Sequence, residues 1–238
     1  MAELPLDKDE FTKALYAKRD SYWREHPFHT RLHQGELSRH EIRSWIANRW
    51  CYQAALPRKD AAILANCPLP EVRRRWIGRI VYQDGSGEGE GGLEAWLRLA
   101  EAAGLTREEV IAERYVAPSV RFATDAYVTF ARERPWPEAV AASLTELFSP
   151  DLMRERVTAM RQHYTWIDPA GYAYFESRTS AAASDAEVAL DLVLSHCRTR
   201  DEQDAAQDAL AFKCDVLWAL LDGIEHAAAD QLAARHEQ

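Results

Sequence analysis

Three stretches of this chain have apolar residues at helical spacing with one cation in the middle of the apolar face. The cations are Arg49, Arg156 and Lys213. The residues that share these faces are Ile42, Trp45, Ile46, Tyr52, Gln53 and Leu56 for the first, Leu152, Met153, Val157 and Met160 for the second, and Leu210, Val216, Leu217, Leu220 and Ile224 for the third. A fold that turns these faces inward must therefore bury three cations.

Burying an unpaired cation is costly, so each of the three should have an anionic partner or lie near water. For any one of them, a side chain that reaches the surface or an internal ion pair is the ordinary explanation. The same pattern on three separate helices favours a different explanation, because each helix pays the desolvation cost separately. We therefore expect Arg49, Arg156 and Lys213 to converge on a pocket that binds a small polyanion.

The composition limits where such a ligand can bind. The 238 residues are enough for one domain with a sizeable core, and we expect a single domain covering residues 1–238. The net charge is −9, and no basic run is interleaved with aromatic residues, so nucleic acid is excluded as a partner. A site for an anion must be local and sheltered, since the overall charge repels it.

Cysteine spacing and hydropathy indicate the compartment. The four cysteines (Cys51, Cys67, Cys197 and Cys214) show no CxxC spacing, and the first ten residues are polar and acidic, unlike a signal peptide. No apolar run approaches the roughly 18 residues that a membrane span needs. We expect reduced thiols, a cytoplasmic protein and no membrane partner.

Helix signals dominate the sequence, and convincing period-two alternation is absent, which predicts an all-α fold. Four capping boxes can be recognised: Ser38/Glu41, Thr106/Glu109, Ser184/Glu187 and Thr199/Glu202. Pro57 is expected to kink or break the helix that contains Arg49. The predicted helices cover about residues 8–25, 38–56, 58–66, 70–83, 92–103, 106–114, 118–133, 137–148, 150–163, 169–179, 184–197 and 201–233.

Motifs for metal, phosphate or covalent chemistry are missing from the sequence. The Gly-rich segment 84–92 lacks the Gly-Lys-Ser/Thr ending of a phosphate loop and carries two glutamates, so it is expected to be a mobile connector or a lid. No Glu-x-x-His pair lies in a core helix, and the segment with His26, His29, His33 and His40 resembles a helix end and turn. We expect no metal site and no covalent nucleophile.

Polar residues on otherwise apolar faces suggest acid–base chemistry. A tyrosine one helical turn from an arginine can exchange a proton while the cation stabilises developing negative charge. Each such residue, taken alone, is more often a packed tyrosine or a surface arginine. The residues concerned are Tyr127, Glu146, the pair Tyr174 and Arg178, and the pair Arg79 and Gln83.

Several longer motifs resemble the pyrroloquinoline quinone synthase family. The resemblance runs from about residue 10 to residue 227 with the motifs in family order, so it is highly specific. The motifs are HPFHTRLHQGELSRHEIRSWIANRWCYQ, PRKDAAILANCP, IVYQDG, GGLEAWLRLAEAAGL, RFATDAYVTF, SLTELFSP, GYAYFESR and ALAFKCDVLWALLD.

The resemblance implies a heme-oxygenase-like helical bundle, usually a homodimer, and an oxidase that uses no metal or redox cofactor. Members close the last ring of the polycarboxylate precursor AHQQ and oxidise it with O2, which gives pyrroloquinoline quinone and hydrogen peroxide. By matching positions, it implies that Tyr174, Arg178 and Gln83 are catalytic. It assigns substrate binding to Tyr22, Arg49, Gln53, Arg79, Tyr127, Glu146, Arg156 and Lys213.

Three positions depart from the family pattern, which has histidines where this chain has Trp23, Gln83 and Met153. Glutamine can form hydrogen bonds, but it cannot take up a proton near neutral pH. The departures leave an alternative open: a paralogue with reduced or altered activity, which binds or carries the quinone or oxidises another polycarboxylate.

Overall fold

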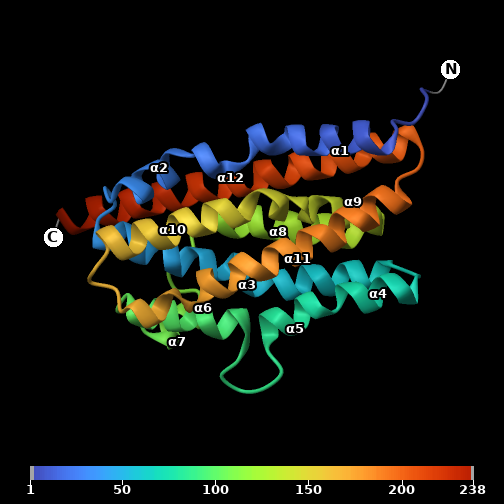
Figure 1. Cartoon of the computed structure of the whole chain (residues 1–238). Helices are drawn as coiled ribbons and strands as arrows, with labels where there is room; N and C mark the ends of the chain where they lie inside the picture. Colours follow the sequence, from blue (N-terminus) through green and yellow to red (C-terminus); the bar gives the residue numbers. More distant parts are fainter. Residues whose placement is uncertain (1–2, 237–238) are drawn as a thin grey trace.

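The chain folds into a bundle of helices, as its computed structural model shows (Figure 1). The structure describes the backbone of residues 3–236 and the side chains of residues 3–179 and 182–229. Within residues 3–236 there is no strand, so the all-α prediction is confirmed. The predicted domain 1–238 includes residues 1, 2, 237 and 238, which lie outside the described residues.

The elements follow one another along the chain without long interruptions. They are α1 (Lys8–Ala17), η1 (Lys18–Ser21), η2 (Trp23–Glu25), α2 (Pro27–Gln34), α3 (Arg39–Asn66), α4 (Pro70–Trp76), α5 (Gly78–Asp84), α6 (Gly91–Ala102), α7 (Arg107–Ile111), α8 (Pro118–Glu133), α9 (Trp136–Ala141), η3 (Ala142–Phe148), α10 (Ser149–His163), η4 (Pro169–Tyr172), α11 (Ala173–His196) and α12 (Arg200–His236).

The long helices α3, α8, α11 and α12 form the centre of the bundle. Helix α3 packs against α8 and α12, while α11 packs against α10, η3 and α9 (Figure 1). Every residue from 44 to 53 is buried, so α3 has no solvent-facing stripe there. Its N-terminus is capped by Ser38 and Glu41, which bond reciprocally. The polar residues on α3 are therefore forced inside.

Helix α3 continues through Pro57, so the predicted break at this residue is wrong. Proline in a helix removes one backbone hydrogen bond and costs about 3 kcal/mol. Pro57 itself and its neighbours Ala55, Lys59 and Asp60 are buried, and their packing offsets that cost. The helix therefore extends the face of Arg49 by a further ten residues.

Several other predicted boundaries are also wrong. The capping signal at Ser184 starts no helix, because an alanine-rich segment with high helix propensity carries α11 through it. The predicted helix 70–83 is two helices that meet at Ile77. The segment after His26, expected to be a helix end and turn, forms helix α2, with Pro27 in its first turn and Gly35 (φ 77°) ending it.

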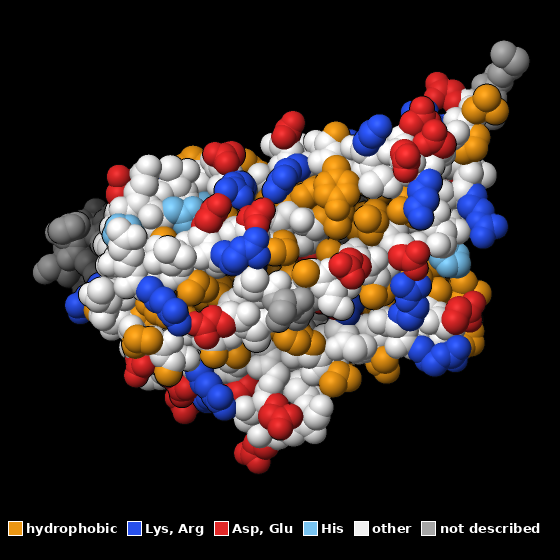
Figure 2. Space-filling view, viewed as in Figure 1, with side chains coloured by type: hydrophobic (Ala, Val, Ile, Leu, Met, Phe, Trp, Pro, Cys, Tyr) orange, Lys and Arg blue, Asp and Glu red, His pale blue; other side chains and the backbone are white. Residues whose placement is uncertain are grey.

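The Gly-rich segment connects α5 to α6 and protrudes from the bundle (Figure 1). Its two ends touch: a Cβ on Gly91, which has φ of 92°, would lie 2.5 Å from the backbone nitrogen of Gly85. Acidic side chains lie on this protrusion, while the rest of the visible face mixes both charges (Figure 2). No helix among the described residues is long and apolar enough to cross a membrane.

Candidate active site

A cavity with a free volume of about 60 Å³ lies between the central helices. Helix α3 contributes five of the seventeen lining residues, more than any other element, and the rest come from the segment before α2, from α8, η3, α10, α11 and α12. The lining residues are Tyr22, Trp23, Arg49, Tyr52, Gln53, Leu56, Lys59, Tyr127, Ser143, Thr145, Glu146, Ser149, Met153, Tyr174, Arg178, Lys213 and Leu217. The sequence elements predicted to converge therefore do meet, although they lie far apart in the chain.

Arg49 and Lys213 enter this cavity without an anionic partner. Arg49 is 6% exposed, its Nε and Nη1 atoms lack hydrogen-bond partners, and its guanidinium lies 4.6 Å from the ring centroid of Trp23. Lys213 is 1% exposed, donates to the Tyr52 hydroxyl at 2.7 Å and lies 3.6 Å from the ring centroid of Tyr127. Neither forms an ion pair with any described residue. Their unused charge is available to an anionic ligand.

Lys213 is a weaker base than an exposed lysine, because it is buried and has cations nearby. Removal from water lowers the pKa of Lys213 well below its ordinary value, and the nearby cations Lys59 and Arg49 lower it further. An anion bound beside the ammonium would reverse part of this pKa shift. The cavity is therefore built to gain stability when negative charge enters it.

Arg156, the third embedded cation, does not line the cavity; it lies behind its wall. Its Nη2 donates to the Nε2 atom of His29 at 2.8 Å, and its guanidinium lies 5.4 and 5.6 Å from the ring centroids of Trp45 and Phe175. Burial, and then repulsion by Arg49, lowers the pKa of Arg156 to about 9. It contacts a thioether, an imidazole and two aromatic rings, all neutral, so its charge adds to the positive potential of the cavity.

Arg79 and Arg178 differ from these cations because both are paired with carboxylates. Arg79 donates to both oxygens of Glu146, at 2.7 and 2.6 Å, and Arg178 bonds Glu146 as well as Asp185, the latter at 2.8 Å. Asp60 completes the group through Arg79 at 3.4 Å. Glu146 and Arg178 line the cavity, but Arg79 lies behind them. Arg79, predicted to bind substrate, is therefore separated from the cavity by Glu146 and Arg178 in this arrangement.

Replacing Glu146 with Gln should destabilise the protein by about 3–5 kcal/mol at pH 7, because two buried guanidiniums lose their shared carboxylate. Burial alone would raise the pKa of Glu146, but Arg79 and Arg178 overcome this and lower it to about 2. The stabilisation is therefore complete above the ordinary pKa near 4.5 and is lost as the pH falls towards 2. Urea unfolding of both proteins at several pH values measures this difference.

The exposed ion pair between Glu176 and Arg161 provides the matched control. Both side chains are about half exposed (47% and 55%), so Glu176→Gln should cost less than about 1 kcal/mol. Equal losses in the two variants would contradict the structural role given to Glu146.

Phenols and amides form the rest of the wall. The Gln53 amide donates to the Tyr174 hydroxyl at 2.7 Å, and its own Oε1 has no partner. Burial raises the pKa of Tyr22 to about 12 and also raises the pKa of Tyr127, so both phenols keep their protons at neutral pH. The cavity thus combines protonated hydroxyls, free cations and aromatic walls, a combination that suits a planar polyanion.

Comparison with known proteins assigns the chain to a family. Residues 12–223 match the model of the TENA/THI-4/PQQC family. The chain belongs to this family. It is 51% identical to the pyrroloquinoline-quinone synthase of Cronobacter sakazakii over 93% of this chain and 88% of the relative. It is also 51% identical to that of Pseudomonas aeruginosa, over 95% of this chain and 91% of the relative.

Solved structures confirm the predicted heme-oxygenase-like fold. A domain from Shewanella denitrificans described as having a heme oxygenase-like fold has a TM-score of 0.76 at 14% identity, with 93% of each chain covered. A TenA homologue from Pseudomonas syringae has a TM-score of 0.70 at 13% identity, with 94% of each chain covered. At these identities the likeness establishes the fold alone.

The three positions that depart from the family pattern lie in different surroundings. Trp23 and Met153 line the cavity, where the Trp23 indole lies against the Arg49 guanidinium. Gln83 is buried at the end of α5 but does not line the cavity, and its Oε1 has no hydrogen-bond partner. A Cβ on Gly92 would lie 2.5 Å from this oxygen, so a larger residue there would displace the Gln83 amide. The predicted catalytic Gln83 is thus adjacent to the protruding loop.

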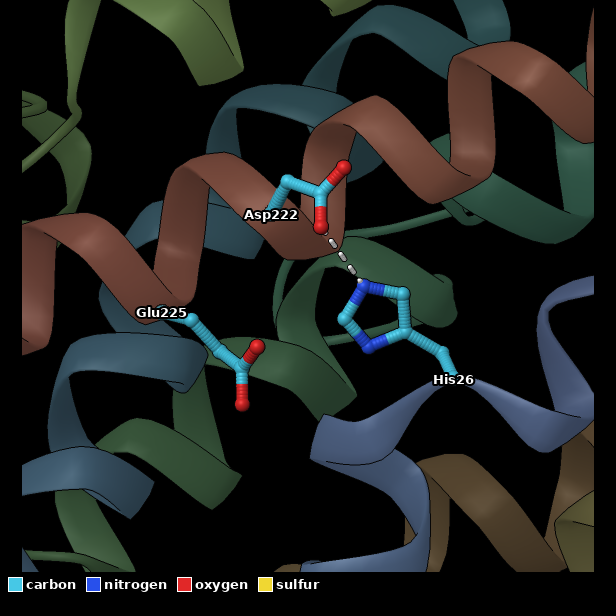
Figure 3. A group of neighbouring side chains, drawn as sticks. All are labelled: His26, Asp222 and Glu225. Carbon is cyan, nitrogen blue, oxygen red and sulfur yellow. Dashed lines mark hydrogen bonds and ion pairs between the residues drawn. The ribbon is translucent and has the colours of Figure 1, made fainter.

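One cluster outside the cavity has the composition of a metal site: His26, Asp222 and Glu225 (Figure 3). Nδ1 of His26 accepts from the backbone N–H of Phe28, which assigns the ring proton to Nε2, and Nε2 lies 3.1 Å from Asp222. Both ring nitrogens are therefore committed. In this arrangement His26 caps helix α2 and has no free lone pair for a metal ion.

The sequence prediction missed Lys59, Tyr52, Ser143 and Thr145, all of which line the cavity. Lys59 stands ten residues after Arg49, so it continues the same helical face. The predicted break at Pro57 places Lys59 on a separate helix and so hides this signal. Thr145 and Ser143 lie on the 3-10 helix η3, whose three-residue repeat does not follow the helical pattern used in the prediction.

Proposed function

We propose that this protein catalyses the ring closure and O2-dependent oxidation of a polycarboxylate precursor, AHQQ, to pyrroloquinoline quinone with release of hydrogen peroxide. The observation that carries this proposal is the cavity with two buried, unpaired cations, Arg49 and Lys213. Relatives at 51% identity over almost the whole chain are pyrroloquinoline-quinone synthases, and their named product matches the anionic ligand that the cavity favours.

The side chains have separate tasks in this proposal. Arg49 and Lys213 neutralise carboxylates and quinone oxygens, while the aromatic walls hold a planar ring and exclude water. Tyr174 and the ion-paired Arg178 face the same cavity and are proposed to exchange protons and stabilise reduced oxygen. The electron-rich ring of the substrate supplies the electrons for O2, so we propose that no metal or redox cofactor takes part.

Mixing the protein with AHQQ in air-saturated buffer tests this activity. An oxidase consumes O2, releases peroxide and converts the precursor absorbance to that of the quinone. Binding of AHQQ with an unchanged precursor spectrum would instead support the alternative, a carrier of the quinone. The observation that favours this second function is Gln83, which cannot exchange a proton near neutral pH.

Gln83 does not line the cavity of the ligand-free protein, so we expect its replacement with His to raise turnover of AHQQ by about tenfold, which is below the 10²–10⁴-fold typical of an acid–base group in contact with substrate. The gain should depend on pH with a histidine-like midpoint, which the wild type lacks. Single-turnover absorbance measurements give the rate. Gln83→Asn, which keeps the amide but adds no titratable group, is the control, and an equal gain in that variant would contradict the explanation.

We also propose that the protein is a cytoplasmic homodimer, as the family resemblance implies. Light scattering of the purified protein across a range of concentrations tests the dimer. A monomer mass at all concentrations would contradict it.

A further inference from the structure

A chain of buried polar groups leads from an internal ion pair to the wall of the cavity. The Lys59 ammonium lies 2.5 Å from Oδ1 of Asp60 and donates to the Ser143 hydroxyl at 3.1 Å. The Ser143 hydroxyl lies 3.3 Å from the hydroxyl of Tyr127. All four residues are at most 3% exposed, so water does not replace these contacts. The predicted site and the proposed reaction assign no role to Lys59 or Ser143.

Lys59 forms a buried ion pair with Asp60, whose charge counteracts the lowering of the Lys59 pKa by burial. Asp60 accepts from Lys59 and also from the indole N–H of Trp76 at 2.9 Å, and Arg79 lies 3.4 Å from the same oxygen. The Asp60 carboxylate therefore accepts from three donors and holds the Lys59 ammonium in place by a charge-assisted hydrogen bond. An ammonium has hydrogens to donate and no lone pair, so Ser143 must accept from Lys59.

The direction of the hydrogen bond from Lys59 to Ser143 determines how Ser143 interacts with the Tyr127 hydroxyl. With a lone pair of its oxygen occupied by Lys59, Ser143 still has its own hydrogen, and the Tyr127 oxygen is the described partner within reach. When Ser143 donates to Tyr127, the phenol proton is free to point into the cavity. Lys213 lies 3.6 Å from the centroid of the same ring and makes the phenol a stronger donor.

We propose that Lys59 and Ser143 are positioning residues that present the Tyr127 hydroxyl as a hydrogen-bond donor to an anionic or quinone oxygen of the ligand. The inference rests on the proposed function for the identity of that ligand. It assigns a specificity to this part of the wall: an oxygen acceptor is favoured and an ammonium or amide N–H is rejected, because a donor would face the phenol proton.

A double-mutant cycle on Ser143 and Tyr127 tests the inference, with pyrroloquinoline quinone as the ligand and tryptophan fluorescence as the signal. Ser143→Ala should raise the Kd about fivefold to tenfold, the effect of one buried hydrogen bond. In the Tyr127→Phe background, the same substitution should change the Kd less than about twofold, because Ser143 acts only through the phenol. Ser143→Thr, which keeps the hydroxyl, should stay within about threefold of wild type.

Ser44→Ala is the control, since Ser44 is also a buried serine but bonds Asn48, away from the cavity. It should leave the Kd unchanged in both backgrounds. An unchanged Kd for Ser143→Ala would contradict this inference, and so would an equal loss of affinity with and without the Tyr127 hydroxyl. Either result would leave the proposed function standing. If the wild-type protein does not bind the quinone, the proposed function is wrong and the inference falls with it. Thermal unfolding shows whether each variant is folded.

Discussion

Replacing Arg49 with Ala should weaken binding of pyrroloquinoline quinone by about 2–5 kcal/mol, which corresponds to roughly 30-fold to several-thousand-fold in Kd. The guanidinium is buried, it has two nitrogens without partners, and no described carboxylate neutralises it. Its charge is therefore satisfied only when an anion enters the cavity. Isothermal titration calorimetry of the wild type and the variant measures the difference directly.

Arg43→Ala is the control for this experiment, because Arg43 lies on the same helix but is exposed and stacks on Trp166 outside the cavity. The control should bind the quinone within about threefold of wild type. A wild-type Kd for Arg49→Ala would show that the ligand binds elsewhere, and it would remove the basis of the proposed function.

Most of the fold could be predicted from the sequence, because its signals are local. Apolar spacing of three and four residues, the caps at Ser38 and Thr199, and proline in first turns identify the helices and most of their ends. The failures occur where packing overrides a local rule. Pro57 does not end α3, since the buried residues on both sides of it hold the helix together.

The cavity could be predicted only in part. Arg49 and Arg79 look equivalent in the sequence, as cations on partly apolar helical faces. Their difference arises from tertiary structure: Arg79 meets Glu146, which is 67 residues away, whereas Arg49 meets aromatic rings. Whether a buried cation is paired depends on contacts between distant helices, which helical periodicity does not contain. For the same reason, the neutral partner of Arg156, His29, could not be foreseen.

Replacing Lys213 with Met should stabilise the empty protein by about 1–4 kcal/mol and abolish tight binding of the quinone. A methionine of similar length fills the space among Tyr52 and Tyr127 without desolvating a charge, and exchanging buried charges for apolar groups is often stabilising. Stability and function therefore oppose each other at this position. Urea unfolding of the ligand-free proteins and calorimetric titration measure the two effects.

The gain in stability should depend on pH in a direction that identifies its cause. The pKa of Lys213 is lowered in the folded state by burial and by the neighbouring cations Lys59 and Arg49. A base with a lowered folded pKa destabilises the protein most at pH values below that pKa, and the penalty disappears as the pH rises to the ordinary value near 10.5. The gain in unfolding free energy from Lys213→Met should therefore shrink between neutral pH and pH 10.5. A gain that does not change with pH would show that it comes from packing alone. Saturating quinone should reverse the order of stability at pH 7, because only the wild type gains from binding the anion.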